Sequence, residues 1–166
     1  MTENDKRLSD LVHLVEVNTN SEEGFLNAAK NIRNSELENQ LIDYARQHAR
    51  FAAEIQQEVV RLGGNPPEHG TASGEVHRGW MDLKSALTGN SAGAILSSCE
   101  SGEDSALGAY DQAEADISSG HVFTMLQGSG SRLPVSVRAF SGSSVRSRTV
   151  SNSQRTRRAH TGVTIS

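Results

Sequence analysis

The stretch ELENQLIDYARQHARFAAEIQQEVVRL, residues 36–62, predicts the fold of this chain more clearly than any other part of it. Small and apolar residues, with one histidine among them, recur there at the three- and four-residue spacing of one helix face. That face carries Leu37, Leu41, Ala45, His48, Ala52, Ile55, Val59 and Leu62. The run GGNPP, residues 63–67, follows at once, and glycine followed by proline is typical of a helix end.

A second long helix is predicted before this stretch, over residues 6–33. Gly24 weakens its middle, because glycine in a helix interior costs about 1 kcal/mol relative to alanine. The break between the two helices falls at Ser35. We expect Ser35 to cap the helix over 36–62, with Glu38 three positions later completing a capping box.

Further helical segments are predicted in the second half of the chain. Residues 63–90 form a long connection, which contains a short amphipathic helix at about 74–88. A long helix over about 91–117 follows. The segment HVFTMLQ, residues 121–127, then begins a fourth helix of the bundle, which remains incomplete because the helical pattern stops after it. The sequence therefore predicts an all-α fold.

Charge divides the chain into an acidic body and a basic tail. Up to Asp116 there are 20 acidic residues and 9 lysines or arginines, whereas seven arginines and no acid follow. Residues 128–166 are rich in serine, arginine and glycine and lack helical periodicity, so we expect them to be mostly disordered. The predicted organisation is a helical bundle over 1–127 followed by this tail. A shifted reading frame would produce the same abrupt change, so the sequence leaves the origin of the tail open.

The composition indicates a cytoplasmic protein. No apolar run is long enough to span a bilayer, and the N-terminus MTENDKRLSD lacks the apolar core of a secretory signal. Cys99 is the single cysteine, so no intrachain disulfide can form.

Glutamates interrupt the apolar faces of two predicted helices. The face of the 6–33 helix carries Leu8, Leu11, Val15, Asn18, Glu22, Phe25, Ala29 and Ile32. The face of the 91–117 helix carries Ile95 or Leu96, Cys99, Glu103, Ala106, Tyr110 and Ala113. A carboxylate on an inward face has to be paired, protonated, hydrogen-bonded or bound to a metal, because desolvating it alone is too costly.

Counting from the helix ends places Glu22, His48 and Glu103 at one level of the bundle. Glu22 and His48 are equally far from residue 35, where two antiparallel helices would turn. If the 63–90 connection crosses the length of the bundle, Glu103 reaches the same level. Facing oxygen and nitrogen ligands are how bundles bind iron, manganese or zinc. These three residues, with Glu54 as a further candidate, are the predicted metal ligands.

Simpler interpretations of the same residues stay open. His48 is equally explained as a hydrogen-bonded core residue, and Glu22 as a solvated one, because Glu23 adjoins it. Glu100 and Asp104, spaced four apart, are secondary metal candidates but are better explained as a solvated acidic face. No histidine follows a glutamate at the Glu-x-x-His spacing, which argues against a di-iron centre of the standard kind.

Four segments resemble a bacterial family of ferritin-like four-helix-bundle proteins of unknown function. They are EEGFLNAAK, ARFAAEIQQEVVRLGGNP, HRGWMDLKSALTG and CESGED, and the similarity extends over about residues 8–127. The resemblance implies an up-down bundle with one long crossover, and it implies no established activity. It further implies that the family has acids at the positions of Glu22, Glu54, Glu100, Glu103 and Asp104, whereas the position of His48 is variable.

Three classes of function follow from these observations. The first is a non-enzymatic bundle that acts by self-association, as a homo-oligomer, or by protein contact, with stress responses as one setting. The second is a carboxylate-bridged bundle that binds iron, manganese or zinc in a redox or storage role. The third is weak association with nucleic acid through the basic tail, where Arg155, Arg157 and Arg158 cluster.

Overall fold

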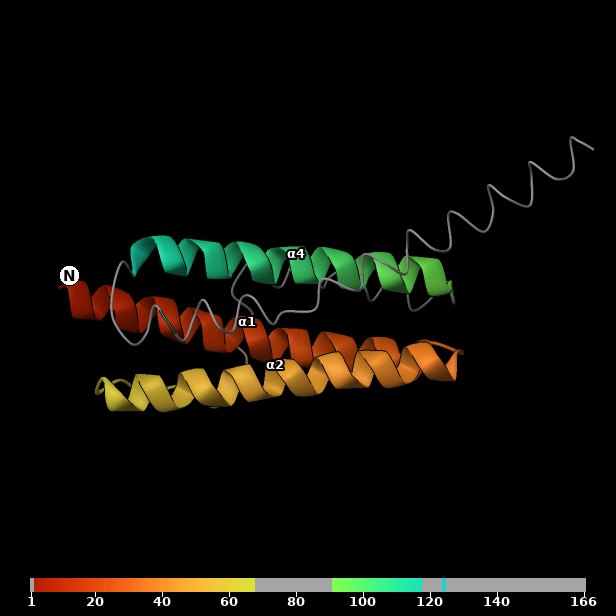
Figure 1. Cartoon of the computed structure of the whole chain (residues 1–166), viewed down its shortest axis with the longest axis horizontal. Helices are drawn as coiled ribbons and strands as arrows, with labels where there is room; N and C mark the ends of the chain where they lie inside the picture. The colour runs from red at the N-terminus through yellow and green to blue at the C-terminus, as the bar shows by residue number, and fades with distance from the viewer. Residues whose placement is uncertain (1, 68–90, 118–123, 125–166) are drawn as a thin grey trace, which may run out of the picture. The chain divides into compact units, whose positions relative to one another are not determined.

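The described residues of this computed structural model, 2–67, 91–117 and 124, form three long helices and no strand. The helices are α1, Glu3–Asn31, α2, Ser35–Arg61, and α4, Ala92–Asp116 (Figure 1). The predicted all-α fold is therefore confirmed, and each predicted boundary of these helices agrees to within three residues. The expected helices over 74–88 and 121–127, apart from Thr124, and the arginine-rich tail lie outside the described residues.

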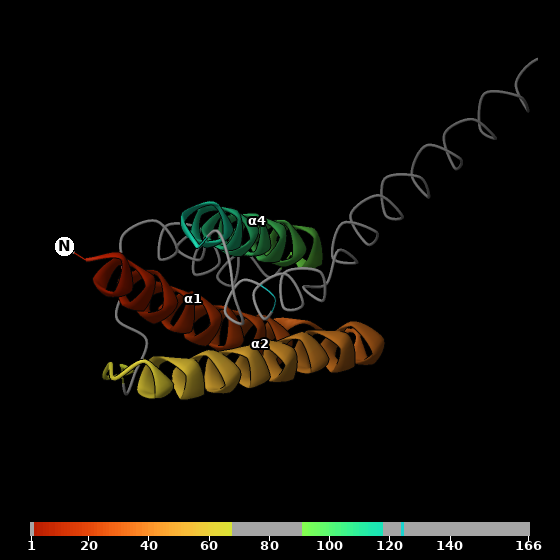
Figure 2. The same ribbon diagram turned by 60° about the vertical axis from the view of Figure 1, so that its left-hand side comes forward.

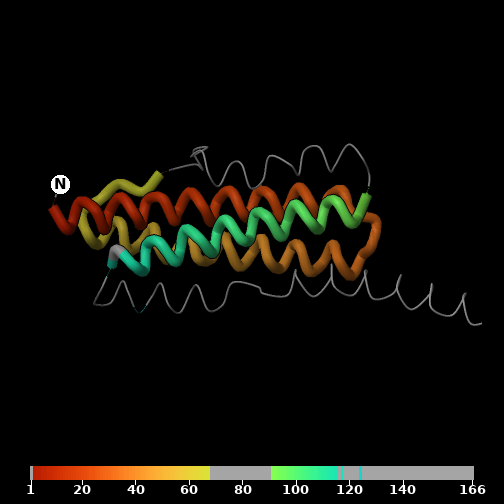
Figure 3. Tube along the Cα trace, turned by 90° about the horizontal axis from the view of Figure 1, so that it is seen from above, coloured from red at the N-terminus to blue at the C-terminus, as the bar shows by residue number. Residues whose placement is uncertain are grey.

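Helix α1 packs against both α2 and α4. The turn at residues 32–34 makes α2 antiparallel to α1, and α4 begins at the same end as α2 and runs in the same direction (Figures 2 and 3). This direction of α4 is the one that the counting argument required. None of the described helices is long and apolar enough to cross a membrane.

Side chains at the helix starts satisfy backbone N–H groups that have no partner within the helix. Thr2 and Asp5 form a capping box at α1, with the Asp5 N–H donating to Thr2 Oγ1 at 3.2 Å and the Thr2 N–H donating to Asp5 Oδ2 at 2.8 Å. These bonds lower the pKa of Asp5. At α2 the cap is Asn34, whose Oδ1 accepts from the Leu37 N–H at 3.0 Å. The prediction that Ser35 caps this helix was wrong by one residue, because the extended backbone that an N-cap requires occurs at Asn34.

The glycine pair ends α2 as predicted, and it does so through a Schellman motif. The Gly63 N–H donates to Val60 O and the Gly64 N–H donates to Val59 O, both at 2.9 Å. Gly63 has φ +83°, which glycine adopts without the steric cost that other residues incur. A Cβ atom at Gly64 would lie 2.7 Å from Leu8 Cδ2, so the second glycine lets the chain pass close to the start of α1.

One apolar cluster joins the three helices where α1 begins and α2 and α4 end. Its buried members are Leu11, Leu14, Val15, Phe51, Ile55, Val59, Tyr110, Ala113 and Ile117. Burial of each large aliphatic or aromatic side chain contributes about 1.5–3 kcal/mol to the stability of the folded state. Tyr110 belongs to this cluster and its hydroxyl accepts a hydrogen bond from Asn18, so the apolar core adjoins the buried polar side chains.

A buried polar layer as the candidate functional site

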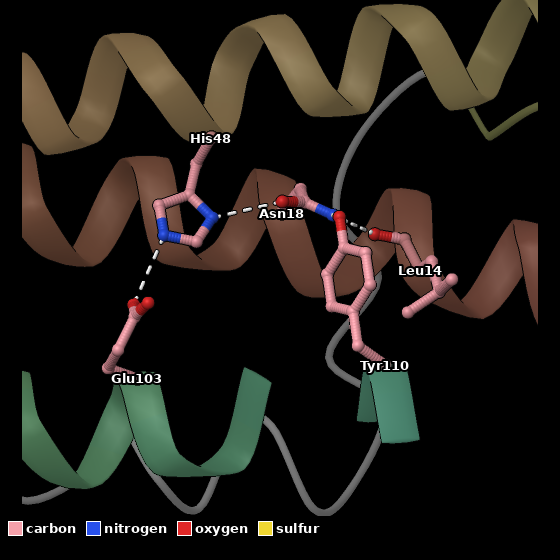
Figure 4. A network of polar contacts seen from close by, with 5 residues as sticks. All are labelled: Leu14, Asn18, His48, Glu103 and Tyr110. Atoms are coloured by element: carbon pink, nitrogen blue, oxygen red, sulfur yellow. Dashed lines mark hydrogen bonds and ion pairs between the residues drawn. The ribbon is translucent and has the colours of Figure 1, made fainter. Parts of the chain in front are cut away.

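Four polar side chains from three helices meet inside the bundle (Figure 4). Asn18 comes from α1, His48 from α2, and Glu103 and Tyr110 from α4. Their exposed fractions are 0 % for Asn18 and His48, 1 % for Tyr110 and 4 % for Glu103. We call these four residues the polar layer. Buried polar groups are costly unless they are hydrogen-bonded, so each bond in the layer matters to the stability of the fold.

Asn18 is the centre of the polar layer. Its Nδ2 donates to the Leu14 carbonyl oxygen at 2.7 Å and to Tyr110 Oη at 2.9 Å. A carbonyl oxygen only accepts hydrogen bonds, so the Leu14 contact fixes which side of the amide carries the nitrogen. The Oδ1 atom is therefore the one that faces His48 Nδ1, at 2.9 Å. His48 Nδ1 has to carry a hydrogen and donate it to Asn18.

The second ring nitrogen of His48 meets the carboxylate of Glu103. His48 Nε2 lies 3.2 Å from Glu103 Oε2, and this contact joins α2 directly to α4. Two aromatic rings enclose the imidazole. Phe25 stacks on it with ring centroids 5.5 Å apart, and Phe51 meets it edge-on at 6.4 Å. Both ring nitrogens of His48 therefore face polar groups, whereas the rest of the ring contacts aromatic side chains.

The other carboxylate oxygen of Glu103 has no hydrogen-bond partner among the residues that the structure describes. Oε1 is buried, and the same is true of Ser21 Oγ within the part of the chain that is described. An unpartnered buried acceptor normally costs about 1–3 kcal/mol, and more when it is charged. Glu103 Oε1 is therefore able to accept a proton, a hydrogen-bond donor or a cation.

Besides burial, the charge of Glu103 contributes to the raised pKa of two further titratable groups on α4, Cys99 and Tyr110. Burial, with smaller contributions from the charges of Glu103 and Glu100, raises the pKa of the Cys99 thiol to about 12. Burial also raises the pKa of Tyr110, although the hydrogen bond from Asn18 acts in the opposite direction. Both groups therefore keep their protons at neutral pH, and Cys99 lacks the thiolate character that a nucleophile needs.

The predicted level of His48 and Glu103 agrees with the structure, but that of Glu22 does not. The residue of α1 that meets His48 is Asn18, one turn earlier, and Glu22 is only half-buried beside the buried Ser21. The reason is the position of the turn. The prediction took residue 35 as the middle of the turn, whereas the midpoint between the end of α1 and the start of α2 is residue 33. Asn18 and His48, 30 positions apart, are equally far from residue 33.

The remaining metal candidates lie in other surroundings. Glu54 and Asp104 are exposed and Glu100 is half-buried. Across residues 2–67 and 91–117, no group of three or more His, Cys, Asp or Glu side chains is placed so that it could hold a metal ion. A metal ion bound by Glu22, Glu54, His48 and Glu103 therefore stays a prediction. Of these four, the structure brings only His48 and Glu103 into contact.

Sequence reasoning placed Asn18 and Tyr110 on apolar faces without assigning them a role. A signal was present, because both residues carry hydrogen-bonding groups on otherwise apolar faces, as Glu103 does. Glu58 was also missed. This buried acid on α2 pairs with Arg61 through two hydrogen bonds, from Nε at 2.7 Å and from Nη2 at 2.5 Å.

The fold and the polar layer define an all-α protein whose described helices are tied together by a buried hydrogen-bond network. The chain belongs to the family described as a domain of unknown function, DUF2383, whose profile matches residues 6–116. This range includes all of α2 and α4 and most of α1. No curated protein and no solved structure matches the chain.

Proposed function

We propose that this protein is a non-enzymatic, ferritin-like helical bundle that acts by self-association or by contact with another protein. The observation that supports this most is that the polar layer is turned inward. Asn18, His48 and Tyr110 bond to one another or to Glu103 and are almost fully buried. A group that acts on a substrate has to reach it, whereas these groups are enclosed by the helices that carry them.

The polar layer has a structural purpose that fits this function. A helix that slides by one residue moves 1.5 Å along its axis and turns by about 100°. Either change would separate Asn18 from His48 or His48 from Glu103. Buried polar residues can fix the register of helices in this way, at some cost in stability. With Asn18, His48 and Tyr110 hydrogen-bonded inside it, the bundle would act through its surface.

Light scattering coupled to size-exclusion chromatography tests this function over a wide range of concentrations. We expect a mass above the 17.8 kDa of one chain, or a stable complex with a defined protein partner. A chain that remains a monomer at every concentration, and that cross-links in cells to no other protein, would contradict the proposal. A variant lacking residues 128–166 shows whether the tail contributes to any association.

Metal binding is the second candidate function, and Glu103 Oε1, which has no hydrogen-bond partner among the described residues, favours it. His48 also resembles a metal ligand, because ligating histidines usually donate their other N–H to an oxygen acceptor, as Nδ1 does to Asn18. His48 Nε2 and the Glu103 carboxylate would supply two ligands of the types that iron, manganese and zinc accept. The described residues supply no third ligand, so water or other parts of the chain would have to complete the site.

Elemental analysis and a cobalt titration test this candidate. We expect purified protein to hold iron, manganese or zinc, and Co²⁺ to give visible absorption bands that H48Q and E103A lose. The matched control is E23Q, which changes an exposed glutamate on α1 and should keep the bands. Metal far below one ion per chain after aerobic and anaerobic purification, with no Co²⁺ bands, would exclude this function.

A further inference from the structure

We propose that the bundle binds one buried water molecule, which bridges Ser21 on α1 and Glu103 on α4. Such a site goes beyond the proposed function, because it exists whether or not the chain associates. Two buried oxygen atoms, Ser21 Oγ and Glu103 Oε1, and the register of the three helices support it.

Ser21 carries a fully buried hydroxyl that has no hydrogen bond among the described residues. A serine or threonine within a helix can donate to the carbonyl oxygen four residues earlier. Thr19 donates in this way to Val15 O at 2.9 Å, and Ser98 donates to Ala94 O at 3.1 Å. Ser21 Oγ makes no bond of this kind, so its hydroxyl needs a partner from outside its own helix.

The register between α1 and α4 places Ser21 near the level of Glu103. Val17 packs against Ala106 in a small apolar cluster, so these two residues share a level of the bundle. Ser21 follows Val17 by four residues, which is about 6 Å along α1. Glu103 precedes Ala106 by three residues, which is about 4.5 Å along α4. Because the two helices run in opposite directions, both steps lead toward the same end of the bundle (Figure 3).

The contacts of His48 lead to the same level independently. Asn18 accepts from His48 Nδ1 at 2.9 Å, and Phe25 stacks on the same ring with centroids 5.5 Å apart. Ser21 is buried between these two residues on α1, three positions after the first and four before the second. His48 Nε2 lies 3.2 Å from Glu103 Oε2. Ser21 and the Glu103 carboxylate therefore lie at the level of the same imidazole.

Water can join the two oxygen atoms where a direct bond does not. Ser21 Oγ and Glu103 Oε1 are not bonded to each other, because each lacks a hydrogen-bond partner within the described part of the chain. One water molecule can bridge oxygens about 4.5 Å apart. In the bridge the Ser21 hydroxyl donates to the water, and the water donates to Glu103 Oε1. Water can reverse either bond, so the bridge requires no particular charge on Glu103.

The surroundings suit a water molecule and give it a structural effect. Buried waters typically bind polar groups that would otherwise be unpartnered. Gly24, three residues after Ser21, is also buried and has no side chain to occupy the space. The bridge adds a second polar connection between α1 and α4, beside the bond from Asn18 to Tyr110 Oη. It thereby strengthens the register of these two helices.

The variant S21V removes the hydroxyl and puts methyl groups in its place. The bound water then loses one of its two partners, so we expect S21V to lose one long-lived water relative to the wild type. The matched control is T19V, which also places valine in α1 and also removes a hydroxyl. Because the Thr19 hydroxyl bonds to Val15 O, T19V should keep the water.

Magnetic relaxation dispersion of the solvent water compares the full-length wild type, S21V and T19V. The dispersion amplitude should fall by one water in S21V alone. A high-resolution crystal structure of the wild type should show a water within about 3.2 Å of both Ser21 Oγ and Glu103 Oε1.

Equal amplitudes for wild type and S21V would overturn the proposal. In the crystal structure, the absence of such a water or a direct bond between the two oxygens would also overturn it. A metal ion bound by Glu103 and His48 in that position would overturn it as well, and would support the second candidate function instead. The crystal structure of the wild type decides the matter even if S21V does not fold.

Discussion

Asn18 Oδ1 lies 2.9 Å from His48 Nδ1, and both side chains are completely buried. This one contact links α1 to α2, and through the Asn18 amide nitrogen it continues to Tyr110 on α4. A short, neutral side chain thus connects all three described helices. The two glutamates that interrupt the apolar faces differ in role, since Glu103 joins this network and Glu22 has only a half-buried position.

Replacing Asn18 by alanine should destabilise the fold by about 2–4 kcal/mol. The substitution removes three hydrogen bonds and leaves the buried N–H of His48 without an acceptor, which costs more than the lost bonds alone. Urea unfolding followed by circular dichroism measures the change. N39A provides a matched control at an exposed position of α2, and its effect should stay within about 0.5 kcal/mol. Equal effects of N18A and N39A would show that the polar layer contributes little.

Hydrophobic periodicity was sufficient to predict the helices, because the phase of a helix is repeated over many residues. The faces of α1 and α4 were correctly predicted to contain Asn18 and Glu103. The pairing of residues between helices depends instead on the middle of the turn, a single point that periodicity does not define. Placing it at residue 35 rather than 33 brought Glu22 to His48 in place of Asn18. An error of two residues in the middle of the turn therefore leaves the predicted fold correct but changes which residues are predicted to meet in the site.

The hydrogen bonds of the polar layer could not be predicted from the sequence for a related reason. Asn18, Glu103 and Tyr110 were on the expected faces, but a position on a face does not specify which atoms meet. The orientation of the Asn18 amide depends on the Leu14 carbonyl, a backbone group of its own helix. Backbone acceptors have no sequence signature, so the tautomer of His48 becomes assignable only from the structure.

Glycine substitutions at the end of α2 and within α4 should have opposite effects. G63A places a side chain at φ +83° and should destabilise by about 1 kcal/mol. G64A should cost more, because the new Cβ would lie 2.7 Å from Leu8 Cδ2 and 2.9 Å from Val59 Cγ1. G108A meets nothing within 4 Å at an exposed position inside α4, and it should stabilise by about 0.5–1 kcal/mol.

Thermal unfolding of the three glycine variants at one pH provides the comparison. The expected order of midpoints, from highest to lowest, is G108A, wild type, G63A and G64A. A midpoint of G64A at or above that of the wild type would mean that the start of α1 does not pack against the Schellman motif. A stabilising effect of G63A would mean that this residue does not adopt the left-handed conformation.

Cys99 should react with thiol reagents only when the bundle opens. Its thiol is buried, and its pKa is raised to about 12, so the folded chain offers neither access nor thiolate at pH ~8. In the unfolded chain the thiol ionises near pH ~8.5, so the folded state binds more protons above that value and stability falls as the pH rises. C99A should therefore lessen the loss of stability between pH ~9 and ~11. The labelling rate with a chromogenic disulfide, measured at increasing urea, should follow global unfolding. Fast labelling in the absence of urea, at a rate near that of a free thiol, would place Cys99 at an accessible surface and contradict both expectations.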